Sequence, residues 1–469
     1  MNLTELLDQT TSRWPQKAAL VEGDVVVSYA GLVEQIDALS SRLRALRLTP
    51  GCRVGLCQPN SINYVALTFA LWRTGAVVVP IPTECTQEEF STIAATLQLE
   101  AVLTRTPLEN SAPLPPECFF TRLPPPPADN RGLNIAFIRF TSGTTNARKG
   151  VVLCHETVRD RIAAANRAFR IGPEDRVMWC LPMSHHFLIT IVLYLSQGAT
   201  IVLARHALAR PFLEAVNRWR GTVLYAAPFH YALLARESSG ARLSSVRLAV
   251  STTCALPHDV AEDFFNRFNL PLVQALGIIE LGLVSLNTDD PRRRWNSVGR
   301  PLADFRVRIL APDNDGCGEV AVTGPGMFDA YAAPWLLREQ VASDGWFGTG
   351  DIGRLDADGF LFLAGRKTAV INLAGRKVFP EEIEAVINRH PAVRESRVYG
   401  RLHPHLGEVV EADVVLAQAG ADPEAVREFC RAHLAAYKVP SRVQVVSALP
   451  RTVATGKIRR AAVAGCSVP

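Results

Sequence analysis

The sequence predicts an α/β protein with a large N-terminal domain of βα-layered sheets and a small α+β C-terminal domain. The chain has 469 residues, of which 48% are hydrophobic and 20% charged, so it can form more than one domain and bury a large core. Up to about residue 300, short apolar runs alternate with segments of helical periodicity, which is typical of buried, largely parallel sheets. Beyond that point the pattern changes to short antiparallel strands with turns, and from Gly365 a compact unit of helices and strands follows.

The N-terminal elements follow from apolar periodicity. We expect helices over residues 29–48 and 63–74, and strands over 53–57 and 76–80. Residues 107–127 are rich in proline, and we expect an irregular surface connection there.

The same alternation continues through the rest of the chain. Strands are expected at 135–138, 151–153, 176–180, 200–203, 223–226, 246–250, 395–399 and 409–416, and helices at 158–169, 380–388 and 423–433. The longest apolar stretch, 187–204, is interrupted by Ser196, Gln197 and Gly198. We therefore expect a helix, a turn and a strand there, and no membrane span.

The loop 140–150, Phe-Thr-Ser-Gly-Thr-Thr-Asn-Ala-Arg-Lys-Gly, lies between two predicted strands and is dense in hydroxyls and glycine. Its residues alone leave two interpretations open. It is either a polar hairpin loop, or a loop that turns backbone N–H groups, hydroxyls and the Lys149 ammonium onto a polyphosphate. It is not a Walker P-loop, because Lys149 is followed by Gly150 and not by Ser or Thr.

Charge and cysteine usage indicate in which compartment the protein works and which kinds of partner it binds. The ten cysteines are scattered, with no C-x-x-C, and the N-terminus has no basic region followed by an apolar one, so we expect a cytoplasmic protein. From Arg366 to the end, 16 Lys+Arg face 10 Asp+Glu, whereas the whole chain carries only +5. This basic segment suits an anionic ligand or an acidic protein, but without long basic runs it does not indicate nucleic acid.

Five segments in order resemble the adenylate-forming superfamily, which includes acyl- and aryl-CoA synthetases, adenylation domains of peptide synthetases, and luciferase. The segments are 140–150, Leu276-Gly277-Ile278-Ile279-Glu280, 345–351, 365–384 and 450–458. The resemblance covers nearly the whole chain and is closest to the aryl-acid-activating members. It implies an adenylation domain over 1–365 that includes a small β-barrel-like part, and a small mobile domain over 366–469 with a hinge near 366–368.

The resemblance also implies an ATP and Mg²⁺ site. Residues that would hold the β- and γ-phosphates are Thr141, Ser142, Gly143, Thr144, Thr145 and Lys149. Glu280, with Thr144, would bind Mg²⁺, since a hard cation prefers oxygen ligands.

Further roles carry over to single residues. Asp351 would accept hydrogen bonds from the ribose hydroxyls, and Arg366 would lie near the ribose or phosphate. The AMP-contacting positions would be Thr253, Cys254, Leu276 and Gly277. The catalytic residues would be Lys457, which stabilises charge in the transition state, and His185; Gly375 would line the thiol channel after domain rotation.

The acid pocket is expected to be uncharged. Amino-acid-activating relatives have an Asp where this chain has His186, so an α-amino acid substrate is disfavoured. The pocket positions that the resemblance implies are His185, His186, Thr190, Ala249, Ser251, Ala275, Leu283 and Val284. Such a lining suits a flat ring or a short acyl chain.

Several positions depart from the family pattern. They are Asn146, Arg148, Thr252, Leu276 and Ile279. One lost hydrogen bond costs on the order of 1 kcal/mol, so we expect an active enzyme. The leading hypothesis is an acid–thiol ligase for an aryl or other non-amino acid, with CoA or a phosphopantetheinyl carrier protein as acceptor. The alternatives are transfer to a non-thiol nucleophile, a short or medium aliphatic acid, and a degenerate nucleotide-binding protein.

Overall fold

The computed structural model describes residues 1–124, 130, 132–140, 149–204, 208–373, 376–403, 407–417, 420, 422–434, 436–451 and 458. The chain forms two compact units. The first holds most of residues 1–307 together with 322–347, and the second holds 308–321 and 348–469. The mixed α/β fold class with a large and a small part is confirmed. The boundary at 365/366 and the hinge near 366–368 stay predictions.

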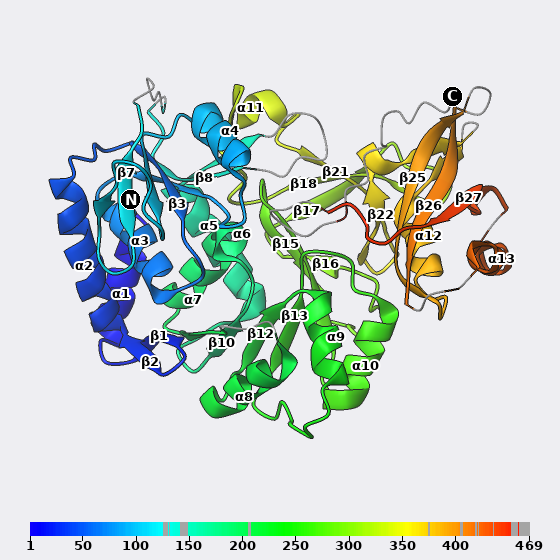
Figure 1. Ribbon diagram of the computed structural model, residues 1–469, viewed down its shortest axis with the longest axis horizontal. Helices are drawn as coiled ribbons and strands as arrows, with labels where there is room; N and C mark the ends of the chain where they lie inside the picture. The colour runs from blue at the N-terminus through cyan, green and yellow to red at the C-terminus, as the bar shows by residue number, and fades with distance from the viewer. Residues whose placement is uncertain are drawn as a thin grey trace. The chain divides into compact units, whose positions relative to one another are not determined.

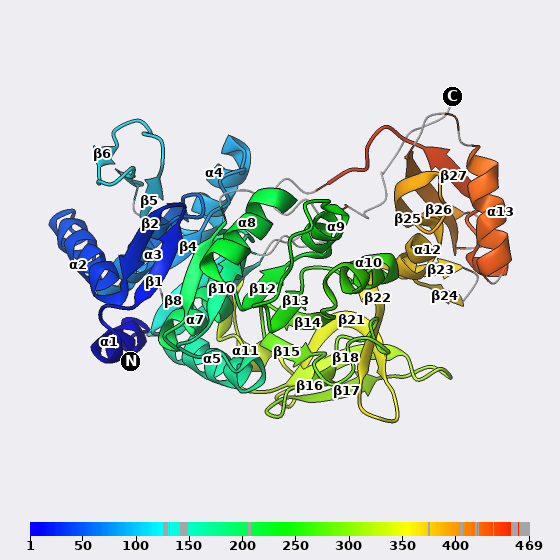
Figure 2. The ribbon, with the colours of Figure 1, turned by 90° about the horizontal axis from the view of Figure 1, so that it is seen from below.

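The first unit contains a nine-stranded sheet whose centre is parallel. Its strand order is β16 (Arg300–Pro301), β15 (Gly282–Leu286), β14 (Leu272–Ile278), β13 (Leu248–Ser251), β12 (Val223–Ala226), β10 (Arg176–Trp179), β11 (Thr200–Leu203), β1 (Ala18–Glu22) and β2 (Val25–Ser28). Helices α8 (Ala209–Trp219), α9 (Pro228–Arg236) and α10 (His258–Phe268) lie on one side of β10, β12, β13 and β14 (Figure 2). Apolar residues of these helices, such as Phe212, Tyr231 and Phe264, are buried against the sheet.

A second nine-stranded sheet in this unit carries the central loop. Its order is β20 (Trp335–Leu337), β19 (Ala330–Ala332), β9 (Gly150–Cys154), β8 (Ile135–Phe140), β4 (Val77–Pro80), β3 (Arg53–Cys57), β5 (Ala101–Thr104), β7 (Phe119–Arg122) and β6 (Ala112–Pro113). The irregular connection expected over 107–127 is wrong in part. Phe120 is buried, and β7 adds to the edge of β5 as an antiparallel strand despite the nearby prolines.

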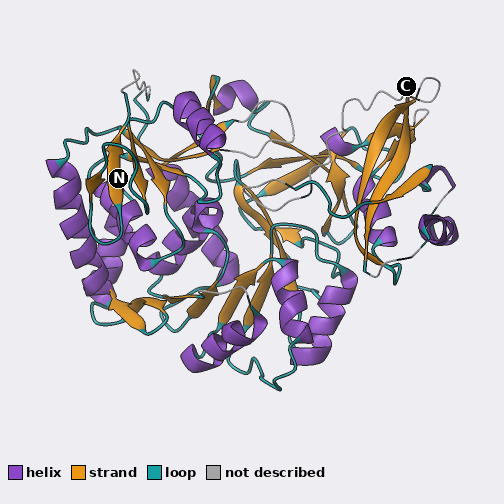
Figure 3. Ribbon diagram, viewed as in Figure 1, coloured by secondary structure: helices purple, strands orange, loops and turns teal. Residues whose placement is uncertain are grey.

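The first five helices of the first unit are α1 (Thr4–Arg13), α2 (Tyr29–Ala45), α3 (Ile62–Arg73), α4 (Gln87–Leu97) and α5 (His155–Phe169). Of these, α2, α3 and α4 begin at side-chain caps. Ser28 and Ser61 accept N-cap hydrogen bonds, and Thr86 with Glu89 forms a capping box. Figures 1 and 3 show these helices packed on the strands of the first unit.

The apolar stretch after Pro182 forms α6 (Met183–His186), a π-helical turn over Phe187–Ile191 and α7 (Val192–Ser196), before a turn and β11. The expected order of helix, turn and strand is confirmed. Within the described part of the chain, no helix is long and apolar enough to cross a membrane.

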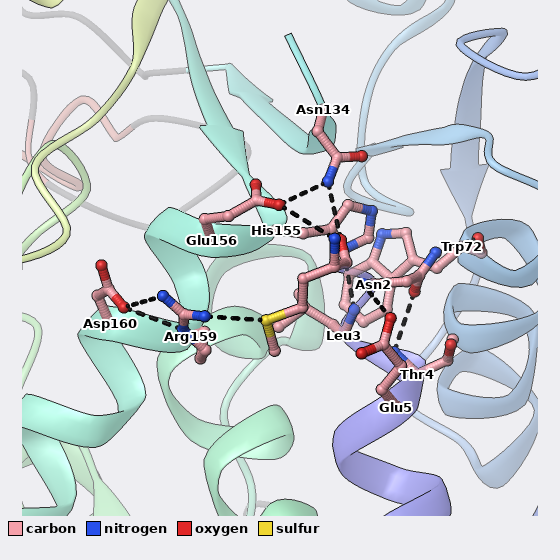
Figure 4. Close-up of polar contacts among 11 residues, drawn as sticks. Asn2, Leu3, Thr4, Glu5, Trp72, Asn134, His155, Glu156, Arg159 and Asp160 are labelled. Atoms are coloured by element: carbon pink, nitrogen blue, oxygen red, sulfur yellow. Dashed lines mark hydrogen bonds and ion pairs between the residues drawn. The ribbon is translucent and has the colours of Figure 1, made fainter.

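A polar network fixes the N-terminal residues to the start of α5 (Figure 4). The Leu3 N–H donates to Nδ1 of the buried His155 at 3.1 Å. Asn134 donates to the carbonyl of Met1 and to Glu156, both at 2.8 Å. Burial lowers the pKa of His155 to about 4, so this ring is neutral in the folded protein at neutral pH.

The second unit contains two further sheets. One has the order β17 (Arg306–Leu310), β18 (Gly318–Thr323), β21 (Phe347–Leu355) and β22 (Leu361–Arg366). The other has the order β24 (Arg376–Val378), β23 (Ile371–Leu373), β26 (Gly407–Leu416) and β25 (Val393–His403), with β27 (Arg442–Val445) on β26. Helices α12 (Pro380–Ile387) and α13 (Pro423–His433) close a core that includes Ile383, Val414 and Val426.

Candidate active site

The predicted phosphate loop joins β8 to β9, which pair in antiparallel register with Phe140 opposite Gly150. Gly150 lies in a crowded position, because a Cβ there would lie 2.6 Å from Leu97 Cδ2 and would force that side chain to move. Lys149 lies at the end of the loop with its Nζ 4.6 Å from the centre of the Tyr331 ring. The predicted residues outside the described part of the chain are Thr141, Ser142, Gly143, Thr144, Thr145, Gly375 and Lys457, and so are the departures Asn146 and Arg148.

Glu280 lies in the tight turn between β14 and β15, close to the same tyrosine. The Tyr331 hydroxyl donates to Glu280 Oε1 at 3.0 Å. Tyr331 therefore contacts both Lys149 and Glu280, the predicted phosphate-binding and magnesium-binding residues. One cation and one carboxylate are thus brought together in the first unit.

The turn that carries Glu280 is held through its backbone by Arg161 on α5. The guanidinium donates to the carbonyls of Ile279 and Glu280, each at 2.7 Å, and also to the carbonyl of Gly326. Arg161 is 1% exposed, and burial lowers its pKa to about 10 while Asp329 and Glu280 oppose that shift. The side chain stays protonated at neutral pH and fixes the main chain from which the Glu280 carboxylate projects.

Asp329 connects Arg161 to the helix that carries it. Its carboxylate accepts from the Cys154 N–H at 2.7 Å and from the Thr157 hydroxyl at 2.8 Å, both at the start of α5. Gly326 has φ +68°, and a Cβ there would lie 2.4 Å from Arg161 Cγ. The position therefore needs glycine both for its backbone and for space.

Arg139, near the end of β8, lies beside the predicted catalytic His185 on α6. Its Nη2 is 3.4 Å from His185 Nδ1. Because arginine only donates hydrogen bonds, Nδ1 is the acceptor, and the proton of a neutral ring is on Nε2. Burial lowers the pKa of Arg139 to about 10, and the neighbouring charge of Glu280 opposes that shift.

His186, the next residue, faces two aromatic rings. Its ring centre is 6.4 Å from that of Trp179 and 6.4 Å from that of Tyr225, both in edge-to-face arrangements. The Thr190 hydroxyl donates back to the His186 carbonyl. This part of the predicted acid pocket is aromatic and carries no carboxylate among these contacts.

The remaining pocket positions lie on three adjacent strands, β13, β14 and β15. They are Ala249, Ser251, Ala275, Leu283 and Val284. Ala249 belongs to the buried cluster under α8, α9 and α10. The Ser251 hydroxyl is buried and has no hydrogen-bond partner within the described residues. The strands therefore group these positions, and their contact with a substrate stays a prediction.

The predicted AMP-contacting residues follow the same strands. Thr253, directly after β13, has φ +79°, a strained conformation for a β-branched residue. Cys254 beside it is exposed, whereas Leu276 on β14 is 9% exposed. Gly277 pairs with Leu283 across the β14–β15 hairpin.

The predicted ribose residues lie in the second unit and contact each other. Asp351 on β21 and Arg366 at the end of β22 are register partners, and Arg366 Nε lies 2.7 Å from Asp351 Oδ1. Arg366 also donates to the Thr349 carbonyl at 3.1 Å. The pair forms a fixed carboxylate–guanidinium unit, with about half of the arginine side chain exposed.

Sequence reasoning missed three residues of the site: Arg139, Arg161 and Tyr331. Their partners are 46, 118 and 51 residues away in the chain, counting the contacts to His185, Ile279 and Glu280. No local spacing could have revealed them. The described residues contain no cluster of three or more His, Cys, Asp or Glu that could hold a metal. Of the two predicted Mg²⁺ ligands, Glu280 lies within the described residues and offers a hard oxygen ligand, whereas Thr144 lies outside them.

Comparison with family models gives two matches. The model described as AMP-binding enzyme matches residues 7–332, and the one described as AMP-binding enzyme C-terminal domain matches residues 382–457. The chain is 29% identical over 496 residues to the sulfoacetate–CoA ligase of Cupriavidus necator, with 98% of this chain and 96% of the relative covered.

Two solved structures are similar along their whole lengths. The o-succinylbenzoate CoA synthetase of Bacillus subtilis, in complex with its acyl-adenylate intermediate, has a TM-score of 0.85 and 24% identity, and 97% of this chain and 96% of that chain are covered. The amide bond synthetase of Marinactinospora thermotolerans has a TM-score of 0.79 and 26% identity, with 97% of both chains covered.

Proposed function

We propose that this protein activates a non-amino carboxylic acid, with aryl acids favoured. The chain belongs to the AMP-binding enzyme family, and the relative that it matches along its length is named as a CoA ligase. It is therefore an AMP-forming acid–thiol ligase. The acid and ATP would form an acyl-adenylate with release of pyrophosphate. The acyl group would then pass to the thiol of CoA, or to the pantetheine thiol of a carrier protein.

The observation that carries this proposal is the contact of Tyr331 with both Lys149 and Glu280. A lysine at the end of a hydroxyl-rich loop suits a polyphosphate, and the nearby carboxylate suits its counter-cation. Glu280, with Thr144 by resemblance, would hold Mg²⁺, which when bound supplies charge neutralisation at the phosphates.

The proposed chemistry assigns one task to each of the chain's own groups. A carboxylate oxygen of the acid attacks the α-phosphorus of ATP, and the bond to pyrophosphate breaks. Lys149 would hold the leaving phosphates, while Asp351 would accept from the ribose hydroxyls. His185, with its proton on Nε2, would donate to an oxygen of the reacting groups, and Lys457 would stabilise charge in the transition state.

The aryl-acid preference rests on the groups around His186. Its neighbours Trp179 and Tyr225 are aromatic, and the proposed lining on β13 to β15 is small or apolar. A ring could pack against such walls, and the buried Ser251 hydroxyl could accept or donate one hydrogen bond to a substituent. Without a carboxylate at this point, an α-ammonium group would be left unpaired.

Two alternatives have a specific observation in their favour. The relative from Cupriavidus necator is named for sulfoacetate, a short aliphatic acid, which favours an aliphatic substrate. The similar structure of an amide bond synthetase favours transfer of the acyl group to an amine. A degenerate protein that binds ATP without turnover is the third possibility.

The experiment is an acid panel read out by acid-dependent pyrophosphate release. It contains benzoates, cinnamates, short aliphatic acids and α-amino acids, with Lys457→Ala as the control. CoA, a phosphopantetheinyl carrier protein and a primary amine are then offered to the adenylate. Activity with amino acids alone would refute the substrate class, ATP binding without pyrophosphate release would establish the degenerate alternative, and amide as the sole product would overturn the thiol acceptor.

A further inference from the structure

The guanidinium of Arg139 has more donors than partners. An arginine side chain offers five N–H groups. Within the described part of the chain, its one hydrogen bond is the long 3.4 Å contact to His185 Nδ1. The side chain is partly exposed, so an anion can reach its remaining donors.

A buried hydroxyl in this region has no hydrogen-bond partner. The Tyr64 hydroxyl on α3 is fully buried and makes no hydrogen bond to any described residue. The centre of its ring lies 5.6 Å from that of Phe187, two residues after His185, and the charge of Glu280 favours the protonated form of Arg139. Arg139 on β8 and Tyr64 on α3 therefore both contact the segment from His185 to Phe187.

The position of Arg139 in the chain indicates which anion it would meet. It is the penultimate residue of β8, and the phosphate loop of the proposed ATP site starts directly after this strand. Its hydrogen bond to Nδ1 places the proton of a neutral His185 ring on Nε2. Both side chains are therefore donors close to where the proposed reaction brings a carboxylate and a phosphate together.

We propose that Arg139 binds an oxyanion of the reactants, either the carboxylate of the acid or a phosphate of ATP, beside His185. This inference rests on the proposed function and adds a substrate-binding residue to it. A planar guanidinium binds two oxygens of one anion at once, which a lysine cannot reproduce. Arg139→Gln keeps hydrogen-bonding capacity but loses the charge, whereas Arg139→Lys keeps the charge but loses the planar fork.

The test compares these two variants with wild type and with Arg218→Gln. Arg218 is an exposed arginine on α8 whose partner is Asp24, so its variant measures the effect of losing a surface charge. Acid-dependent pyrophosphate release gives the KM for the best acid of the panel and the KM for ATP. Isothermal titration with ATP and Mg²⁺ in the absence of acid gives ATP affinity without turnover, and thermal unfolding checks that each variant is folded.

We expect Arg139→Gln to weaken the binding of one of the two reactants, the acid or ATP, by about 10- to 100-fold. Arg139→Lys should weaken the binding of the same reactant less. A raised KM for the acid with unchanged ATP affinity identifies the carboxylate as the anion, and a loss of ATP affinity identifies the phosphate. If the KM for the acid and the ATP affinity of Arg139→Gln both stay within twofold of the values for Arg218→Gln, the inference is overturned. If wild type adenylates no acid, the proposed function fails, and unchanged ATP affinity in Arg139→Gln then overturns the inference separately. If Arg139→Gln fails to fold, the KM for the acid and the ATP affinity of Arg139→Lys test the inference in the same way.

Discussion

Replacing Arg161 by methionine should release the turn that carries Glu280. Arg161→Met keeps most of the buried apolar volume but removes the hydrogen bonds to the carbonyls of Ile279, Glu280 and Gly326. The Glu280 carbonyl retains the Phe328 N–H at 2.7 Å as a partner. The substitution therefore leaves two carbonyls, those of Ile279 and Gly326, without the hydrogen bond that they now receive.

The magnitude follows from these losses. Two orphaned buried acceptors cost about 1–3 kcal/mol each, and the removal of a buried charge returns part of that. Asp329 loses a favourable neighbouring charge but keeps its hydrogen bonds to Cys154 and Thr157. We expect the first unit to be destabilised by roughly 3–5 kcal/mol, the range found when one partner of a buried charged network is removed.

Urea denaturation followed by tryptophan fluorescence measures the change, with Arg159→Met as the matched control. Arg159 lies on the same helix, but it is half exposed and its partner is the adjacent Asp160, so its loss should cost less than about 1 kcal/mol. Acid-dependent pyrophosphate release at high Mg²⁺ reports whether Glu280 is still positioned. If the free energies of unfolding of Arg161→Met and Arg159→Met differ by less than about 1 kcal/mol, the proposed role of Arg161 in holding the turn is refuted.

Three further predictions follow from single contacts. The neutral His155 should make wild type lose about 3 kcal/mol of stability as the pH falls from 6.5 towards 4, since its folded pKa is about 4, whereas denaturation of His155→Gln should lack this pH dependence. Thr253→Gly should raise the unfolding midpoint by relieving strain at φ +79°, with a gain of about 1 kcal/mol, and a lower midpoint would show that the backbone is not strained there. Lys149→Met should raise the KM for ATP about tenfold or more in pyrophosphate-release assays, with little change in the KM for the acid, and an equal rise in both constants would contradict a phosphate-specific role.

The fold was largely predictable because its strands are buried apolar runs. The strands expected at 53–57, 200–203 and 223–226 and the helix at 423–433 have these bounds in the structure. Each is short, bounded by turn residues or a cap, and internally consistent in its periodicity. Strand β7 was missed because prolines on either side outweighed two phenylalanines in the pattern, although pairing with β5 needs only four residues.

The sequence predicted residues of the candidate site only where a motif contains them. Glu280, Asp351 and Lys149 stand in segments whose order identifies the family, so a single sequence could name them. Arg161 and Tyr331 stand in no such segment, and each acts across more than 50 residues of chain. A lone arginine in a helical pattern is read as solvent-exposed, yet Arg161 is among the largest fully buried side chains of the described residues.

The backbone contacts of Arg161 also explain why the departure at Ile279 is compatible with an intact site. The family usually places a hydroxyl-bearing threonine at this position, and isoleucine removes that side-chain hydrogen bond. The main chain of Ile279 is nevertheless fixed, because its carbonyl accepts from Arg161 at 2.7 Å whatever the side chain is. The geometry of the adjacent Glu280 therefore depends on a buried cation of α5 and not on the residue beside it. If the resemblance holds at this position, loss of the threonine hydroxyl would cost one interaction with the nucleotide, on the order of 1 kcal/mol, and would leave the backbone support of the carboxylate in place.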